Sequence, residues 1–321
     1  MKGPLLVTGA AGFIGARFVE AARERGLEVI SVDSKEHFGS RPEHIGVDFG
    51  TIVDRDELVS RLQAMPEPAA IVHLGACTDT TELDVAYLRR VNLDYSKMLW
   101  VYATQHKVPL VYASSAATYG GGELGFDDDE TLFSKLKPLN PYGDSKLMFD
   151  LWALEQEKAG KRPPAWSGFK FFNVYGYGER HKEKMASVVL HAYDRILKTG
   201  EALLFKSHRE GIADGHQKRD FVAVEDVVDV LFFALEKPMS RGIFNLGSGQ
   251  ARTFLDLVNA VFAGLKREPK IAFVDTPVEI RDRYQYFTEA KMSRLRAAGY
   301  TQPFSTLEEG VGRYIMRLTT S

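Results

Sequence analysis

Short apolar runs alternate with longer amphipathic stretches along the first half of the chain. Each apolar run is bounded by polar or glycine residues, as expected for buried strands, and the stretches between them carry apolar residues at helical spacing. This alternation predicts a parallel sheet with right-handed crossovers. The predicted strands cover residues 4–9, 28–33, 69–74 and 108–113, and the predicted helices cover residues 16–25, 56–65 and 86–106.

The regular alternation fades in the second half of the chain. A further helix is expected to begin near Pro141, because proline suits the first turn of a helix, and residues 169–174 are typical of the next strand. Long polar segments follow, notably residues 206–218. A helix-like pattern at residues 221–235 and a strand-like pattern at residues 242–247 then indicate a return to the first sheet.

These patterns predict an α/β protein in two parts. The first is a dinucleotide-binding domain with a Rossmann-type, doubly wound parallel sheet, formed by residues 1–172 plus about 220–250. The second is a smaller C-terminal α/β domain that binds the substrate, formed by residues 173–219 plus 251–321.

Composition and charge are those of an ordinary globular protein. The chain has 321 residues, of which 45% are hydrophobic and 26% charged, so it can bury a large core without structural metals. Its formal net charge of -2 gives no basic field, and we expect no nucleic acid partner. The apolar stretch at residues 227–235 is interrupted by Asp229 and is too short to span a bilayer, so no membrane partner is expected either.

Cysteine content adds a constraint on the compartment. Cys77 is the only cysteine, which excludes an intramolecular disulfide and a cysteine-based metal cluster, and we expect no metal site. We interpret Cys77 as a buried bystander rather than a reactive thiol. A single thiol fits a reducing compartment, and the N-terminal residues lack the apolar segment of a signal peptide. The sequence therefore predicts a cytoplasmic protein.

Three glycines lie between the first predicted strand and the first predicted helix. Gly9, Gly12 and Gly15 permit a tight turn, let backbone N–H groups approach a pyrophosphate, and allow the helix to pack closely on the strand. Asp33 ends the second predicted strand, where a carboxylate can accept hydrogen bonds from ribose hydroxyls. The combination predicts a dinucleotide site, and a tight turn without a ligand is the alternative.

The choice between NAD and NADP stays open at this point. Asp33 favours NAD, because a carboxylate repels a 2′-phosphate. Lys35, Arg41 and Arg55 would reverse that preference if they converge on the adenosine ribose, although basic residues in polar loops are usually only solvated.

Ser115, Tyr142 and Lys146 carry the candidate chemistry. Ser115 follows a predicted strand that points to the carboxyl edge of the sheet, where open α/β folds bind ligands. Tyr142 and Lys146 lie four residues apart, on one face of the helix that begins near Pro141. An ammonium and a positively charged nicotinamide both favour the phenolate, so Tyr142 could exchange a proton with a carbinol that Ser115 also binds. Lys146 would in addition hold the nicotinamide ribose.

The glycine turn and these three residues together resemble the short-chain dehydrogenase/reductase superfamily, in its extended sugar-nucleotide branch. Dehydratases of that branch carry an Asp-Glu pair after the active-site serine or threonine, whereas this chain has Ala116 and Ala117 there, which disfavours dehydration. Longer matches resemble the ADP-L-glycero-D-manno-heptose 6-epimerase family. They cover residues 112–121, 172–176, 181–182, 185–188, 218–221, 242–247, 284–285, 287–288 and 295–300.

The resemblance implies an epimerase that inverts C6 of an ADP-linked heptose through a transient 6-keto sugar. It implies bound NADP, with NAD as the other option, a homo-oligomer, and two opposed bases, Tyr142 and Lys182. A phosphate contact or a solvated side chain is the alternative for Lys182. The implied cofactor contacts are Gly9, Gly12, Phe13, Ile14, Gly15, Asp33, Ser34, Arg41, Arg55, Leu74, Gly75, Ala76, Cys77, Thr78, Asn92, Tyr142, Lys146 and Val174. The implied contacts of the ADP-sugar are Ser115, Asn173, Lys184, His191, Phe205, Lys206, Arg219 and Tyr284.

Some positions depart from the family and leave alternatives open. Leu74 stands where glutamate is common, Ser34 where asparagine is common, and Lys184 replaces a smaller residue, so cofactor preference and sugar identity are in question. His191 could equally be a surface or core histidine. The alternative functions are another sugar-nucleotide enzyme, such as a UDP-hexose 4-epimerase or a keto-sugar reductase, and a non-catalytic NAD(P) sensor. The presence of both Tyr142 and Lys146 disfavours the sensor.

Overall fold

A seven-stranded parallel sheet forms the larger part of the molecule. The computed structural model describes residues 3–237, 241–281 and 284–320. The strand order is β10-β6-β5-β4-β1-β2-β3, and every neighbouring pair runs parallel. The strands are β1 (Leu5–Thr8), β2 (Val29–Asp33), β3 (Thr51–Asp54), β4 (Ala70–His73), β5 (Leu110–Ser115), β6 (Trp166–Phe171) and β10 (Gly242–Leu246).

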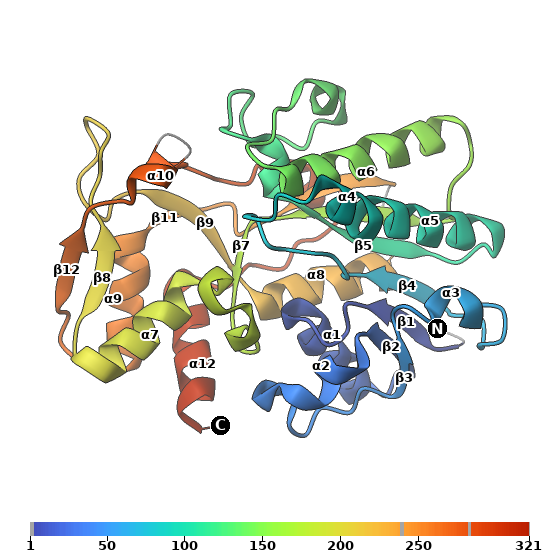
Figure 1. Ribbon diagram of the computed structural model, residues 1–321, viewed down its shortest axis with the longest axis horizontal. Helices are drawn as coiled ribbons and strands as arrows, with labels where there is room; N and C mark the ends of the chain where they lie inside the picture. The colour runs from blue at the N-terminus through green and yellow to red at the C-terminus, as the bar shows by residue number, and fades with distance from the viewer. Residues whose placement is uncertain (1–2, 238–240, 282–283, 321) are drawn as a thin grey trace.

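Helices cover both faces of this sheet (Figure 1). One face packs against α1 (Phe13–Glu24) and α8 (Val224–Glu236), and the other against α5 (Tyr95–Gln105) and α6 (Pro141–Lys158). Because both faces are covered, the central strands are apolar along their length, and β1 is buried at every position. Shorter elements complete this part: α2 (Lys35–Ser40), η1 (Pro42–His44), α3 (Leu58–Arg61), α4 (Val85–Leu88), the π-helical turn η2 (Arg89–Asp94), η3 (Ala116–Tyr119) and η4 (Glu130–Lys135).

A smaller lobe has a core of its own, in which α7, α9 and α12 pack together. It holds a three-stranded sheet of order β11-β9-β7 and a two-stranded parallel sheet of β12 and β8. The remaining elements of the chain are β7 (Asn173–Tyr175), η5 (Arg180–Met185), α7 (Val188–Thr199), β8 (Ala202–Phe205), β9 (Lys218–Ala223), β11 (Ala251–Thr253), α9 (Phe254–Gly264), β12 (Ile271–Val274), α10 (Val278–Arg281), α11 (Ser293–Ala297) and α12 (Leu307–Thr320).

The predicted fold class is confirmed, while several predicted elements are wrong in detail. Residues 169–174 do not form one strand, because the chain changes sheets at Phe172: β6 pairs with β5, and β7 pairs with β9. The start of the predicted helix at residues 221–235 belongs to β9. The helix predicted at residues 56–65 is reduced to α3, and the one at residues 86–106 is interrupted by η2. The proposed domain boundaries stay a prediction.

The strand order reverses at β1, with β2 and β3 on one side and β4, β5, β6 and β10 on the other. In an open sheet of this kind, the crevice at the carboxyl ends of the strands around the reversal is where ligands bind. In the ranges that the structure describes, no helix is long and apolar enough to cross a membrane.

Candidate active site

A cleft of about 1760 Å³ lies between the carboxyl ends of the large sheet and the smaller lobe. The sheet side contributes the glycine turn, the ends of β2, β4 and β5, and the first turns of α6. The smaller lobe contributes η5, α7, β8 and part of β9. Among the residues predicted for cofactor and substrate, the cleft is lined by Gly9, Gly12, Phe13, Ile14, Gly15, Asp33, Arg41, Arg55, Leu74, Gly75, Ala76, Cys77, Thr78, Ser115, Tyr142, Lys146, Asn173, Val174, Lys182, Lys184, His191, Phe205, Arg219 and Tyr284.

The glycine turn forms one end of the cleft and leaves no room for side chains. Gly9 has a φ of 68°, a left-handed conformation that glycine adopts readily, and a Cβ there would collide with the Gly75 backbone. A Cβ at Gly15 would overlap the carbonyl oxygen of Gly9. Helix α1 begins at Phe13, earlier than the predicted start at residue 16. The turn therefore offers the free N–H groups and the positive end of α1 to an anion.

Asp33 lies at the end of β2 and lines the cleft. Its carboxylate accepts hydrogen bonds from the backbone N–H groups of Ala11 (3.1 Å) and Ser34 (2.8 Å), and it contacts the His37 ring at 3.0 Å. Arg41 reaches the same place and donates to the Ala11 carbonyl oxygen. Ser34 occupies the N-cap position of α2 and lies outside the cleft lining. The Asp33 carboxylate is thus held by backbone donors, with one cation close by.

The loop after β4 lines the cleft beside the glycine turn, and Asn92 supports it from behind. Asn92 is buried and does not reach the cleft. Its side-chain oxygen accepts from the Cys77 N–H at 2.8 Å, while its amide donates to the Cys77 carbonyl at 3.1 Å and to the Ser145 hydroxyl at 3.0 Å. Burial raises the pKa of the Cys77 thiol, which lowers its reactivity at neutral pH.

Helix α6 brings Tyr142 and Lys146 to the cleft next to the loop after β4, to which Asn92 links it through Ser145. It begins at Pro141, and the Asn140 side chain caps it by accepting from the Gly143 N–H at 2.8 Å. One helical turn separates the phenol from the amine, so both reach the cleft. The predicted start of this helix is confirmed.

The charge environment of Tyr142 differs from the one expected from the sequence. Burial raises the pKa of Tyr142, and a hydrogen bond with Ser115 offsets this only in part. Burial also lowers the pKa of Lys146 to about 8, against the opposing effect of Asp150. The Lys146 amine donates to the Ala113 carbonyl oxygen at 3.0 Å. The groups of the chain alone therefore keep the phenol protonated, and favouring the phenolate requires an added positive charge such as an oxidised nicotinamide.

A fully buried ion pair supports the wall that carries these groups. Asp150, on α6, lies 2.6 Å from the Lys170 amine of β6, and both side chains are inaccessible to solvent. Asp150 also accepts hydrogen bonds from Ser114 (2.7 Å) and Tyr112 (3.0 Å) of β5. The carboxylate thus joins α6 to two strands directly behind Ser115.

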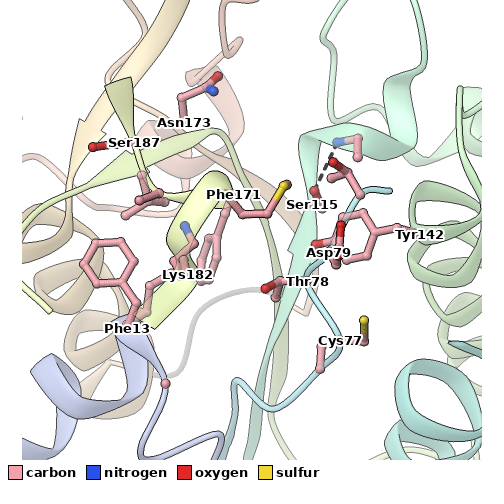
Figure 2. A pocket seen from close by; sticks show the side chains of 18 of the residues that line it. Phe13, Cys77, Thr78, Asp79, Ser115, Tyr142, Phe171, Asn173, Lys182 and Ser187 are labelled. Carbon is pink, nitrogen blue, oxygen red and sulfur yellow. Dashed lines mark hydrogen bonds between the residues drawn. The ribbon is translucent and has the colours of Figure 1, made fainter. Parts of the chain in front are cut away.

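Lys182 faces Tyr142 and Ser115 across the cleft (Figure 2). It belongs to η5, between β7 and α7. Its amine lies 3.9 Å from the Glu179 carboxylate and 5.2 Å from the centre of the Phe13 ring. Burial lowers the pKa of Lys182, and Glu179 acts in the opposite direction. Two groups that can carry protons therefore stand on opposite sides of one space.

Arg219 provides a buried cation at the end of the cleft formed by the smaller lobe. Its guanidinium lies 5.6 Å from the centre of the Phe254 ring and 5.4 Å from that of Tyr284. It donates to the carbonyl oxygens of Lys218 (2.8 Å) and Gln285. Burial lowers the pKa of Arg219, and no carboxylate within the described ranges forms an ion pair with it. A buried arginine in this situation is suited to an anionic ligand.

Of the remaining predicted substrate contacts, four line the cleft and one lies outside it. Asn173, Lys184, His191 and Phe205 line the cleft. Lys206 does not; its amine is 3.5 Å from Asp275 in an exposed ion pair. Among the described residues, no group of three or more His, Cys, Asp or Glu side chains could hold a metal ion.

Sequence reasoning missed several residues that line the cleft: Tyr95, His181, Arg195, Gln217 and Phe254. Arg195 follows His191 by one turn of α7, so helical spacing could have found it. Burial, together with the positive charge of Arg41, lowers the pKa of His181 to about 3, so this ring is neutral. Phe254 had no local signal, because only the fold brings it to Arg219.

The doubly wound sheet, the glycine turn and the Ser115, Tyr142 and Lys146 arrangement define an enzyme that works with a nicotinamide dinucleotide. Residues 5–247 match the model of the NAD dependent epimerase/dehydratase family, and the chain belongs to this family.

Named relatives agree with this assignment along the whole chain. The sequence is 42% identical, over 97% of the chain and 96% of the relative, to ADP-L-glycero-D-manno-heptose-6-epimerase of Fusobacterium nucleatum. It is 43% identical, over 97% of both chains, to the enzyme of that name from Nitratidesulfovibrio vulgaris strain Hildenborough. The resemblance to the heptose 6-epimerases is therefore confirmed.

Solved structures of two sugar-nucleotide epimerases match the fold of this chain. The Helicobacter pylori ADP-L-glycero-D-manno-heptose-6-epimerase matches with a TM-score of 0.82 and 26% identity, over 99% of this chain and 97% of that one. The Thermus thermophilus UDP-glucose 4-epimerase, solved in complex with NAD, matches with a TM-score of 0.79 and 26% identity, over 99% of both chains.

Proposed function

We propose that the protein interconverts ADP-D-glycero-D-manno-heptose and ADP-L-glycero-D-manno-heptose by inverting C6. The observation that carries the proposal is the placement of Tyr142 and Lys182 on opposite sides of one cleft. Inversion of a carbinol carbon needs removal of a hydride from one face and its return to the other, with a proton carrier on each side. The relatives at 42% and 43% identity carry the name of this activity.

In this reaction, different residues of the cleft bind the cofactor, transfer protons and bind the diphosphate. The glycine turn fits a dinucleotide pyrophosphate, because its glycines let the backbone N–H groups approach the phosphates. A Cβ at Gly15 would overlap the Gly9 carbonyl oxygen, so this close turn requires glycine there. When bound, the nicotinamide accepts and returns the hydride. Tyr142 takes the proton from the C6 hydroxyl as the ketone forms, while the Ser115 hydroxyl binds the same oxygen. Lys182 serves as proton carrier for the opposite face, and Arg219 binds the diphosphate.

The test is incubation of the cofactor-loaded protein with ADP-D-glycero-D-manno-heptose, followed by NMR of the C6 proton. We expect both epimers at equilibrium, without net consumption of cofactor. No interconversion in protein that has cofactor bound would contradict the proposal. Turnover of a UDP-hexose in its place would favour a 4-epimerase, and net oxidation of NADPH would favour a keto-sugar reductase.

NADP is the proposed cofactor, supported by Arg41 and Arg55. Both line the cleft at the end where Asp33 lies, and Arg41 is half-buried there. Lys35, in contrast, is exposed, pairs with Glu57 at 3.5 Å and does not line the cleft. Arg41→Ala should weaken NADPH binding by about tenfold or more and change NADH binding little, since a charged hydrogen bond contributes roughly 1.5–3 kcal/mol. Lys35→Ala is the control, and equal losses for both dinucleotides would argue against a 2′-phosphate contact.

Assembly into a homo-oligomer stays a prediction from the family resemblance. Its direct test is the mass of the protein in solution.

A further inference from the structure

Glu179 is a buried carboxylate next to the cleft with no assigned role. It lies just before η5, three positions ahead of Lys182 in the sequence, and is inaccessible to solvent. It does not line the cleft, so it cannot contact substrate or cofactor directly. Burying a carboxylate is costly unless its oxygens are satisfied, which makes its contacts informative.

The Glu179 carboxylate joins the two ends of the segment that carries Lys182. At the far end it accepts from the Ser187 backbone N–H (2.7 Å) and from the Ser187 hydroxyl (2.6 Å). At the near end it accepts from the Gly176 N–H at 3.5 Å. The backbone between these two ends is strained, because Glu183 has a φ of 46°, a conformation that residues other than glycine seldom adopt. The carboxylate therefore holds the segment in a shape that it would not take by itself.

The same carboxylate is the negative charge at the Lys182 amine. Its oxygen Oε2 lies 3.9 Å from Nζ, and on another side the amine meets the apolar ring of Phe13. No other carboxylate of the described residues forms an ion pair with Lys182. Burial lowers the pKa of the amine and Glu179 raises it, so the two effects oppose each other.

The other charged groups around η5 do not neutralise this amine: the buried Glu43 carboxylate accepts from the Arg180 N–H at 3.0 Å and forms no ion pair with Lys182. His181, the preceding residue, is neutral, because burial and the positive charges of Arg41 and Lys182 lower its pKa. Glu183 and Lys184 follow Lys182 directly, and both side chains are exposed. Removal of the Glu179 charge would thus leave the Lys182 amine partly buried against the Phe13 ring, without the negative charge that opposes the effect of burial.

We propose that Glu179 is a positioning residue for the reaction, which holds the Lys182 amine toward the cleft and keeps it protonated until a proton is transferred. This inference rests on the proposed function, in which Lys182 is the second proton carrier. Glu179 acts through Lys182 and through the shape of η5, and it touches no reacting atom.

The experiment compares Glu179→Gln with the matched control Glu183→Gln in the full-length, cofactor-loaded protein. Acylation of Lys182 by an amine-specific reagent is followed by peptide mass spectrometry across a range of pH. This readout reports the amine directly and needs no turnover. The pH midpoint of labelling should fall by about one unit or more in Glu179→Gln, because an opposite charge at this distance favours the ammonium. The control should keep the wild-type midpoint.

Kinetics of the same variants supply the second readout. In Glu179→Gln we expect kcat to fall by about 10- to 100-fold with KM almost unchanged, since substrate contacts are retained. An unchanged labelling midpoint in Glu179→Gln overturns the proposal. If that variant does not fold, Glu179→Asp decides, because its shorter side chain keeps the negative charge but moves it away from the Lys182 amine. The labelling midpoint of Glu179→Asp should then fall below that of wild type, but by less than the shift of about one unit expected for Glu179→Gln. A wild-type midpoint and kcat in Glu179→Asp would overturn the proposal. A shifted midpoint in a protein that lacks heptose epimerase activity would support the positioning role and contradict the proposed function.

Discussion

At the scale of single residues, the proposed proton carrier Tyr142 is a phenol that its surroundings hold in the neutral form. The sequence suggested that the amine one turn away would favour the phenolate. In the structure, the Lys146 amine donates to the Ala113 carbonyl instead, and burial lowers the pKa of that amine to about 8. The proton state of Tyr142 is therefore coupled to the charge of the nicotinamide, which ties proton transfer to hydride transfer.

Tyr142→Phe tests this role while preserving the packing, because the side chain is buried and only the hydroxyl is lost. We expect kcat to fall by about 10²- to 10⁴-fold, the usual contribution of general acid–base catalysis. Cofactor affinity, measured by fluorescence titration, should stay close to wild type. Tyr102→Phe removes the same atom from a buried tyrosine of α5 that does not line the cleft, and it should leave kcat intact. A wild-type kcat in Tyr142→Phe would exclude the phenol as proton carrier.

Among the helices, strands and turns, those whose conformation depends on neighbouring residues were predicted correctly from the sequence. The glycine turn and the start of α6 depend on residues that are neighbours in sequence, and both were found. The break between β6 and β7 at Phe172 was not found, because it depends on the pairing of β7 with β9, in which Asn173 lies opposite the distant Phe221. The exclusion of Lys206 from the cleft depends likewise on Asp275, which only the pairing of β8 with β12 brings near.

Gly15→Ala tests the close contact between α1 and the glycine turn. The added Cβ would overlap the Gly9 carbonyl oxygen, so the turn must open. We expect cofactor affinity, measured by isothermal titration, to fall by about 100-fold or more, since the lost backbone contacts to the pyrophosphate are worth a few kcal/mol. The matched control is Gly312→Ala in α12, where a Cβ would meet open space. Removal of a helical glycine there should leave binding unchanged and stabilise the fold slightly. Equal cofactor affinity in the two variants would show that the turn tolerates a side chain.

Across the whole molecule, one buried histidine links separate segments of the chain at the proposed cofactor site. His73, at the end of β4, lies 2.6 Å from the Thr8 hydroxyl and 2.7 Å from the Ser96 hydroxyl. Ser96 donates its own proton to the Asn92 carbonyl oxygen, so it accepts from the ring, and the other ring nitrogen must accept from Thr8. Thr8 in turn accepts from the Gly75 N–H. The chain of hydrogen bonds runs from β1 through β4 to the helical segment behind the cleft, and it requires a neutral ring.

This network predicts a loss of stability in mild acid. Burial lowers the pKa of His73 from 6.5 to about 3, so the unfolded chain binds this proton more readily than the folded protein does. The free energy of unfolding therefore decreases as the pH falls from about 6.5 toward about 3. Between about pH 7 and about pH 5, His73 alone should account for a decrease of about 2 kcal/mol, measurable by urea unfolding. His73→Gln is less stable at neutral pH because the ring is lost, but its decrease over the same interval should be smaller by that amount. His106→Gln, at an exposed histidine that follows α5, should keep the wild-type decrease. Each variant is compared with itself at the two pH values. If the free energy of unfolding decreases as much in His73→Gln as in wild type, the ring accepts a proton without breaking the network.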